Sequence, residues 1–296
     1  MMNSSKLGFL GAMSIFGTIG IFVRAIPLSP AAIACVRGVL GCLFLLVFMA
    51  AAKKKFSAAD IKGNLPILVL SGIAIGVNWI LLFEAYRYTT VAAATVCYYL
   101  APVFLLIASP LIGEKLTAKK LLCIFTALAG MICMSGVEKG SLPTGAELTG
   151  LALSTGAAVL YALVMLLNKK MTPISAYPKT IVQLAVASAA VLPYVLLTGG
   201  VDHSAMTGAA WGLLLTVGIV HTGVAYTLYF GSLQTLSAQT AAVFSYIDPV
   251  MAVLLSAFLL NEPLDLSGAV GTVLILGSAL YSELPERKRG KPPKRA

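Results

Sequence analysis

Apolar residues fill this chain in long runs, which short polar or proline-containing segments interrupt. Each run is about 20 residues long, the length of an α-helix that crosses a bilayer once. Lys53-Lys54-Lys55 ends the second run, and Lys169-Lys170 ends the sixth. The pattern predicts ten membrane-spanning helices, at approximately residues 7–26, 29–52, 65–87, 90–112, 118–136, 147–168, 178–198, 208–230, 238–260 and 266–283.

The composition favours the same fold class. Hydrophobic residues make up 59% of the 296 residues and charged residues only 11%, whereas about a quarter of a soluble domain is charged. The alternating ten-residue segments of a transmembrane β-barrel do not occur in the sequence. The five cysteines lie inside apolar runs, without the spacings of metal or disulfide frameworks, so we expect no metal and no cofactor. We predict an all-α polytopic membrane protein.

The chain contains an internal repeat. The segment Tyr98-Tyr99-Leu100-Ala101-Pro102-Val103 is echoed 147 residues later as Ser245-Tyr246-Ile247-Asp248-Pro249-Val250, and Trp79 matches Tyr226 at the same offset. The predicted parts are a first five-helix repeat at 1–136, an inter-repeat loop at 137–146, a second five-helix repeat at 147–283 and a basic cytoplasmic tail at 284–296. Because five is an odd number, the second repeat enters the membrane with opposite orientation, an inverted topology typical of secondary transporters.

The basic residues are distributed unevenly between the two sides of the predicted membrane. With ten spans, 17 of the 21 basic residues lie on the side of the N-terminus, and Arg24, Arg87 and Lys139 lie on the other. Positive residues concentrate on the cytoplasmic side of membrane proteins. We therefore predict a multi-pass protein of the cytoplasmic membrane with both termini cytoplasmic. The net charge of +10 has this topological origin, and no nucleic-acid partner is expected.

Several details together resemble the EamA-type proteins of the drug/metabolite transporter superfamily. They are the ten spans in two halves, Pro-Val inside spans four and nine, Glu114 and Glu262 after those spans, Arg37 in span two and Asn78 in span three. Many relatives carry Glu before the proline of span nine, where this chain has Asp248. The resemblance covers essentially the whole chain. It implies a carrier of small molecules, in a family whose substrates include amino acids, metabolites, amines and drugs, often exported.

Two ionisable residues are expected near the middle of the membrane, where a charged side chain costs about 2.5 to 3.5 kcal/mol on insertion scales. Asp248 lies about ten residues into span nine. It is a candidate for proton coupling or for binding a substrate amine, and the alternative is a structural hydrogen bond to the helix end that Pro249 exposes. His221 lies at a comparable depth in span eight. It could pair with Asp248 or be a satisfied polar contact.

Arg37 and Glu84 both fall in the outer halves of their spans. We predict a structural ion pair between them. Arg87, three residues after Glu84, is the alternative partner.

Aromatic and polar residues at mid-membrane depth predict a cavity for a partly apolar solute. The candidate substrate-binding residues are Asn78, Trp79, Tyr99, Tyr226, Tyr246, Asp248 and His221. Core packing is the alternative role for each single tyrosine. Pro102 and Pro249 are expected to bend their helices at equivalent points of the two repeats and so to shape this cavity.

No hydrolase, metalloprotease or phosphate-binding motif occurs in the sequence, so we do not expect an enzyme. The sequence favours a secondary transporter that exports a small metabolite, such as an amino acid or amine, by alternating access and with proton coupling through Asp248. Exchange without protons is a close variant. The alternative class is a membrane-embedded lipid-handling protein or enzyme. Expected partners are the solute and the lipid bilayer, and glycine-rich helix faces leave a homodimer open.

Overall fold

The structure, a computed structural model, describes residues 4–54, 57–108, 110, 117–135, 144–197, 204–233, 235–236, 244–262 and 264–284. Most of the inter-repeat loop, most of the basic tail, Glu114 and His203 lie outside these residues. The helices are α1 (Ser4–Arg24), α2 (Pro30–Ala51), α3 (Ala58–Tyr88), α4 (Val91–Tyr98), α5 (Ala101–Ala108), α6 (Ala118–Ser135), α7 (Gly145–Lys170), α8 (Ala176–Leu197), α9 (Gly208–Gly218), the π-helix η3 (Ile219–Val224), α10 (Ala225–Leu233), α12 (Ile247–Leu259) and α13 (Leu266–Glu283).

Each of the ten predicted spans contains helix, and no strand occurs in the described ranges. Within those ranges, seven helical stretches are long and apolar enough to cross a membrane, and three shorter apolar helices lie in the remaining predicted spans. The prediction of an all-α polytopic membrane protein is confirmed. Long apolar side chains such as Leu122, Phe125 and Phe258 remain exposed on the helix surfaces, as lipid contact requires.

Capping side chains begin several helices at the predicted breaks. Ser29 accepts a hydrogen bond from the backbone N–H of Ala32 at 3.2 Å, directly before a proline that suits the first turn of α2. Thr144 and Glu147 form a reciprocal capping box at the start of α7. These bonds satisfy backbone donors that a short loop at a membrane surface would otherwise leave without partners.

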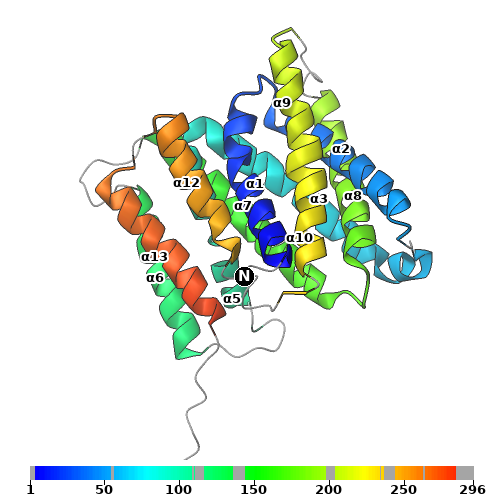
Figure 1. The fold of residues 1–296 in the computed structure, drawn as a ribbon. Helices are drawn as coiled ribbons and strands as arrows, with labels where there is room; N and C mark the ends of the chain where they lie inside the picture. The colour runs from blue at the N-terminus through cyan, green and yellow to red at the C-terminus, as the bar shows by residue number, and fades with distance from the viewer. Residues whose placement is uncertain are drawn as a thin grey trace, which may run out of the picture.

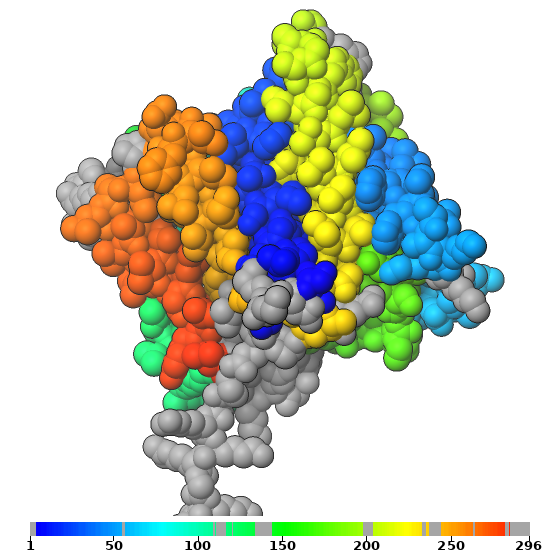
Figure 2. Space-filling view, in the orientation of Figure 1, coloured from blue at the N-terminus to red at the C-terminus, as the bar shows by residue number. Residues whose placement is uncertain are grey.

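The helices pack in pairs that join distant parts of the chain. α1 lies between α10 and α12, as the space-filling view shows (Figure 2). α3 packs on α7 and α8, α2 packs on α8, and α4 packs on α12. α6 and α13 lie side by side at one edge of the molecule (Figure 1). The close approach of α3 to α8 requires glycine, because a Cβ at Gly72 would lie 2.6 Å from Cβ of Val186.

The fourth and ninth spans are interrupted at equivalent positions. α4 ends at Tyr98, a turn covers Tyr99 and Leu100, and α5 begins at Ala101. In the ninth span a turn at Tyr246 precedes α12. Pro102 and Pro249 each lie in the first turn of the new helix, where a missing N–H is tolerated. The predicted bends are thus observed as breaks. The hydrophobic pattern did not indicate η3, the π-helical turn that interrupts the eighth span.

Candidate functional site

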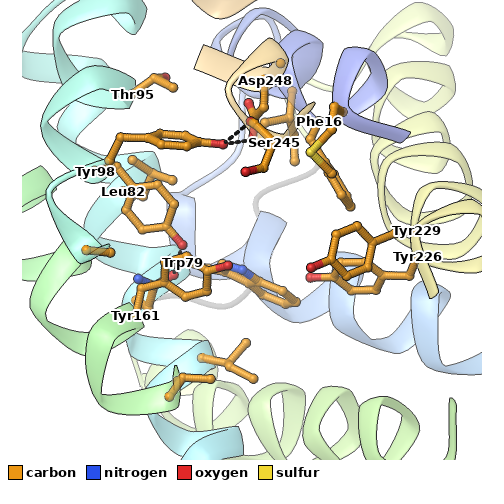
Figure 3. A pocket seen from close by; sticks show the side chains of 18 of the residues that line it. Phe16, Trp79, Leu82, Thr95, Tyr98, Tyr161, Tyr226, Tyr229, Ser245 and Asp248 are labelled. Carbon is orange, nitrogen blue, oxygen red and sulfur yellow. Dashed lines mark hydrogen bonds between the residues drawn. The ribbon is translucent and has the colours of Figure 1, made fainter. Parts of the chain in front are cut away.

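A cavity of about 450 Å³ lies in the middle of the helix bundle. Both halves of the chain contribute to it, and its lining is mainly aromatic and apolar with a few polar groups. The lining includes Phe16, Arg37, Asn78, Trp79, Tyr98, Tyr99, Tyr161, Asn168, Lys179, Tyr226, Tyr229, Tyr246 and Asp248. Figure 3 shows Asp248 and Ser245 on one side of this space, Tyr226 and Tyr229 on another, and Tyr98 and Tyr161 across from them.

Asp248 and Tyr99 connect the two broken spans. The Tyr99 hydroxyl donates to Oδ2 of Asp248 at 2.8 Å, and it also lies 3.1 Å from the carbonyl oxygen of Ser245 (dashed lines in Figure 3). The Tyr246 ring lies 6.0 Å from the Tyr99 ring. The structure therefore brings together three of the predicted site residues, and all three lie beside the helix breaks.

Asn78 and Trp79 line the cavity from α3, as predicted, but Asn78 also holds helices together. Its amide donates to the carbonyl oxygen of Ala157 in α7 at 2.5 Å, and it accepts from the Tyr98 hydroxyl at 3.3 Å. An amide that joins two helices in this way satisfies its own polar groups and fixes the cavity wall. The Trp79 ring lies 4.1 Å from the guanidinium carbon of Arg37.

The predicted Arg37–Glu84 ion pair is wrong. Glu84 pairs with Arg87 at 3.3 Å, one helical turn further along α3. The Arg37 guanidinium instead turns toward the cavity, where Nε donates to the Thr222 hydroxyl at 2.8 Å. The i, i+3 neighbour lies on the same helix face as Glu84 and needs no second helix to reach it.

His221, a predicted substrate-binding residue, is not among the residues that line the cavity, and of its two predicted possibilities the pairing with Asp248 is not the one observed. Its Nε2 lies 2.7 Å from the hydroxyl oxygen of Thr18 in α1, and its ring packs 4.7 Å from the Phe22 ring. The satisfied polar contact, which was the alternative, is what the structure shows. Tyr226, on the same span, does line the cavity.

Sequence reasoning missed Tyr229, Phe16 and Lys179 as cavity residues. Tyr226 and Tyr229 are three residues apart in α10, so the helical period could have identified their common face. Lys179 lies near the start of α8. In the sequence it cannot be distinguished from a lysine that only marks the end of a membrane span. Phe16 packs 5.5 Å from Tyr226 and has no distinguishing sequence feature in an apolar helix.

Glu262, which follows α12, connects several helices at one end of the bundle. Its carboxylate forms an ion pair with Arg24 at the end of α1 and accepts from the Ser256 hydroxyl. It also accepts from the backbone N–H of Val91 at 3.1 Å, in the first turn of α4. A helix N-terminus is a favourable place for a carboxylate. Glu262 thereby ties together helices from both halves on the side away from Ser4.

The EamA-like transporter family model matches residues 4–136 and 148–282. The chain belongs to this family. This EamA-type chain is 28% identical to the "Uncharacterized transporter YxxF" of Bacillus subtilis, over 95% of this chain and 89% of that protein. It is 29% identical to an "Uncharacterized transporter" of Archaeoglobus fulgidus over 90% of this chain and 92% of that protein.

Further comparisons agree with the EamA-type assignment. The chain is 24% identical to the "Uncharacterized inner membrane transporter YicL" of Salmonella typhimurium over 98% of this chain and 99% of that protein. A crystal structure matches with a TM-score of 0.63 at 20% identity, over 95% of this chain and 97% of that one. This likeness concerns the fold. The family and its relatives identify a membrane transporter.

Proposed function

We propose that this EamA-type protein is a secondary transporter that exports a small metabolite, such as an amino acid or amine, by alternating access. The observation that carries the proposal is the cavity of about 450 Å³ between the two halves, next to the breaks at Tyr99 and Tyr246. Transporters of this kind bind their solutes between repeats, beside discontinuous helices. The volume is within the range of small-molecule sites, and the lining combines aromatic walls with few polar groups.

The two halves are proposed to be inverted five-helix repeats. The same family model matches each half separately. The helix contacts support the proposal because they occur in equivalent pairs. α1 packs on α12, and its equivalent α7 packs on α4 and α5. α3 packs on α7 and α8, and its equivalent α9–η3–α10 packs on α1 and α2.

We propose that the protein lies in the cytoplasmic membrane with both its N-terminus and its C-terminus on the cytoplasmic side. Among described basic residues, Lys54 packs on Tyr177 and Lys119 bonds to Leu284 at the end of the bundle where α1 begins and α13 ends (Figure 1). Arg24 and Arg87 lie at the ends of α1 and α3 on the opposite side. This asymmetry supports the cytoplasmic placement, and the relative YicL is named an inner membrane transporter.

The Glu262 contacts support a conformation that is closed on the outer side. They join α1, α4 and α12 beyond the outer end of the cavity. The cavity lining reaches Asn168 and Lys179, which lie toward the cytoplasmic ends of α7 and α8. Alternating access would require these outer contacts to break when the inner side closes.

Proton coupling is proposed to occur at Asp248, the acidic residue among the described cavity-lining residues. Tyr99 donates a hydrogen bond to it, and Tyr86 of α3, Tyr161 of α7 and Arg37 of α2 line the same cavity. α1 contributes only uncharged side chains to the cavity. A carboxyl group in such surroundings can exchange a proton as the cavity changes its access from one side to the other.

The experiment that tests the proposal has two stages. A thermal-shift screen of purified protein with amino acids, polyamines, nucleobases, sugar phosphates and lipophilic cations identifies ligands, because a ligand that binds the folded state raises the melting temperature. Each hit is then tested for counterflow in proteoliposomes. The expected result is transient accumulation of labelled solute against its gradient. Chemical conversion of the hit, or binding without counterflow, would favour the enzyme or lipid-handling alternative.

A further inference from the structure

We propose that Arg37 binds the carboxylate of the transported solute, so that the solute is a small apolar carboxylate, including apolar amino acids. This inference rests on the proposed function, because it assigns a ligand class to the same cavity. It also gives Arg37 a role different from the structural ion pair that the sequence favoured.

The first observation is a buried cation that shares the cavity with Asp248 but forms no salt bridge among the described residues. Arg37 is 5% exposed and lines the cavity. Among the described residues, no carboxylate forms a salt bridge with it. Glu84, which the sequence predicted as its partner, is paired with Arg87. A buried charge normally requires a partner of opposite charge. The anionic group of a solute would supply that partner.

The second observation is that Arg37 is held in position along one edge. Its Nε donates to Oγ1 of Thr222, whose hydroxyl donates in turn to the carbonyl oxygen of Val217 at 3.0 Å. The guanidinium carbon lies 4.1 Å from the Trp79 ring and 5.6 Å from the Phe83 ring. These contacts use Nε and the aromatic rings beside the group. The two terminal nitrogens, which have no bond to described residues, can form the paired bonds that a carboxylate accepts.

The third observation is the charge of the cavity. The charged side chains among its described lining residues are Arg37, Lys179 and Asp248, two basic and one acidic. The excess is positive whether Asp248 is ionised or protonated. Inside a low-dielectric cavity, this excess favours a solute that carries a negatively charged group, whether an anion or a zwitterion.

The aromatic lining of the cavity indicates which group the solute carries besides its carboxylate. Phe16, Trp79, Tyr226 and Tyr229 present aromatic surface to the same space. Aromatic surface binds apolar groups of a solute and excludes strongly hydrated ones. A solute that joins a carboxylate to an apolar group matches both parts of the cavity. A sugar phosphate matches the basic groups but not the aromatic walls, and a polyamine has no anionic group for Arg37.

The test uses matched ligands that differ in one functional group. We would measure the melting temperature of the detergent-purified full chain with phenylalanine, phenylalaninamide, phenethylamine and 3-phenylpropionate, and with the corresponding leucine series, each at up to about 10 mM. The two compounds with a free carboxylate in each series are expected to raise the melting temperature, and the amide and amine are expected to have little effect. Stabilisation by the amide and amine alone, or no stabilisation by any carboxylate, would overturn the proposal.

Variants assign the effect to the guanidinium. Arg37→Gln is expected to weaken carboxylate binding by about tenfold or more, and Arg37→Lys, which keeps the charge and lacks the planar fork, by an intermediate factor. Thr222→Val should weaken binding without changing the order of the ligands, because it removes the acceptor of Nε and the bond to Val217 but leaves the two terminal nitrogens in place. Arg87→Gln, an exposed arginine on the same neighbouring helix as Trp79, is the control and should bind as wild type. Unchanged carboxylate affinity in folded Arg37→Gln or Arg37→Lys would refute the assignment.

Transport assays separate this inference from the proposed function. Counterflow of an amine, with no effect of Arg37 substitution, would leave the transporter proposal intact and refute the carboxylate site. Arg37-dependent binding of carboxylates without counterflow of any of them would support the site and refute the transport function.

Discussion

The Tyr99 hydroxyl lies 3.1 Å from the carbonyl oxygen of Ser245, which is the carbonyl that Pro249 leaves without its usual helical donor. The same hydroxyl lies 2.8 Å from Asp248. A phenol has one proton and can serve only one acceptor at full strength. With Asp248 ionised, that proton is best placed toward the carboxylate. With Asp248 protonated, the carboxyl group can donate to the phenol oxygen and the phenol to Ser245. The protonation of Asp248 is thereby linked to the bonding across the break.

Tyr99→Phe should disturb both stability and coupling. It removes the donor that two partly buried acceptors share, so we expect a loss of about 1–3 kcal/mol in unfolding free energy and a shift in the pH dependence of transport. Thermal unfolding and a pH series of counterflow check the two effects. Tyr88→Phe is the control, because Tyr88 is 40% exposed. A variant that unfolds and transports like wild type would show that the hydroxyl has neither role.

Asp248→Asn should uncouple transport from the proton gradient while preserving the fold. Asparagine has nearly the same shape, can accept from Tyr99 and carries no charge into the bundle, so stability should be equal to wild type or higher. Export driven by inward proton flow should lose its dependence on the gradient, while exchange of solute for solute continues. Proteoliposomes with and without a pH difference provide the measurement. Wild-type gradient dependence in this variant would remove Asp248 from the coupling mechanism.

Glu262→Gln should favour opening of the outer side. The substitution removes the charge that pairs with Arg24, whose side chain is 40% exposed. Loss of such a pair costs about 1 kcal/mol, which is about a fivefold change in a conformational equilibrium. Ala252 lines the cavity from α12, so Ala252→Cys, in a background without the native cysteines, reports access. Labelling from outside by a membrane-impermeant maleimide should accelerate about fivefold or more. An unchanged labelling rate would contradict a closing role for Glu262.

The hydrophobic pattern predicted the helices well, because run length and breaks depend on local sequence. The prolines predicted bends in spans four and nine, where the structure has breaks, since Pro102 and Pro249 act through their own missing N–H groups. Depth along a span could be counted, and this placed Tyr99, Asp248 and Trp79 at the level of the cavity.

The direction in which each side chain points around its helix axis could not be predicted by counting residues along the span. His221 and Tyr226 are five residues apart, which is about 140° around an α-helix, and only Tyr226 faces the cavity. Likewise, Arg37 and Glu84 have similar depths but point to different neighbours. Which faces meet is decided by the packing of helices that are distant in sequence, and a π-helical turn in η3 adds a rotation that the hydrophobic pattern does not reveal.

Two glycines of α1 provide a test of that packing beside the site. A Cβ at Gly17 would lie 2.5 Å from the carbonyl oxygen of Asp248, whereas a Cβ at Gly11 would meet nothing within 4 Å. Gly17→Ala must therefore push α1 away from α12, and we expect a loss of about 1–3 kcal/mol in stability together with impaired transport. Gly11→Ala should gain up to about 1 kcal/mol, since alanine is the better helix former. The melting temperatures of the two variants should move in opposite directions from wild type. Equal shifts would mean that α1 does not approach α12 at Asp248 as closely as this structure has it.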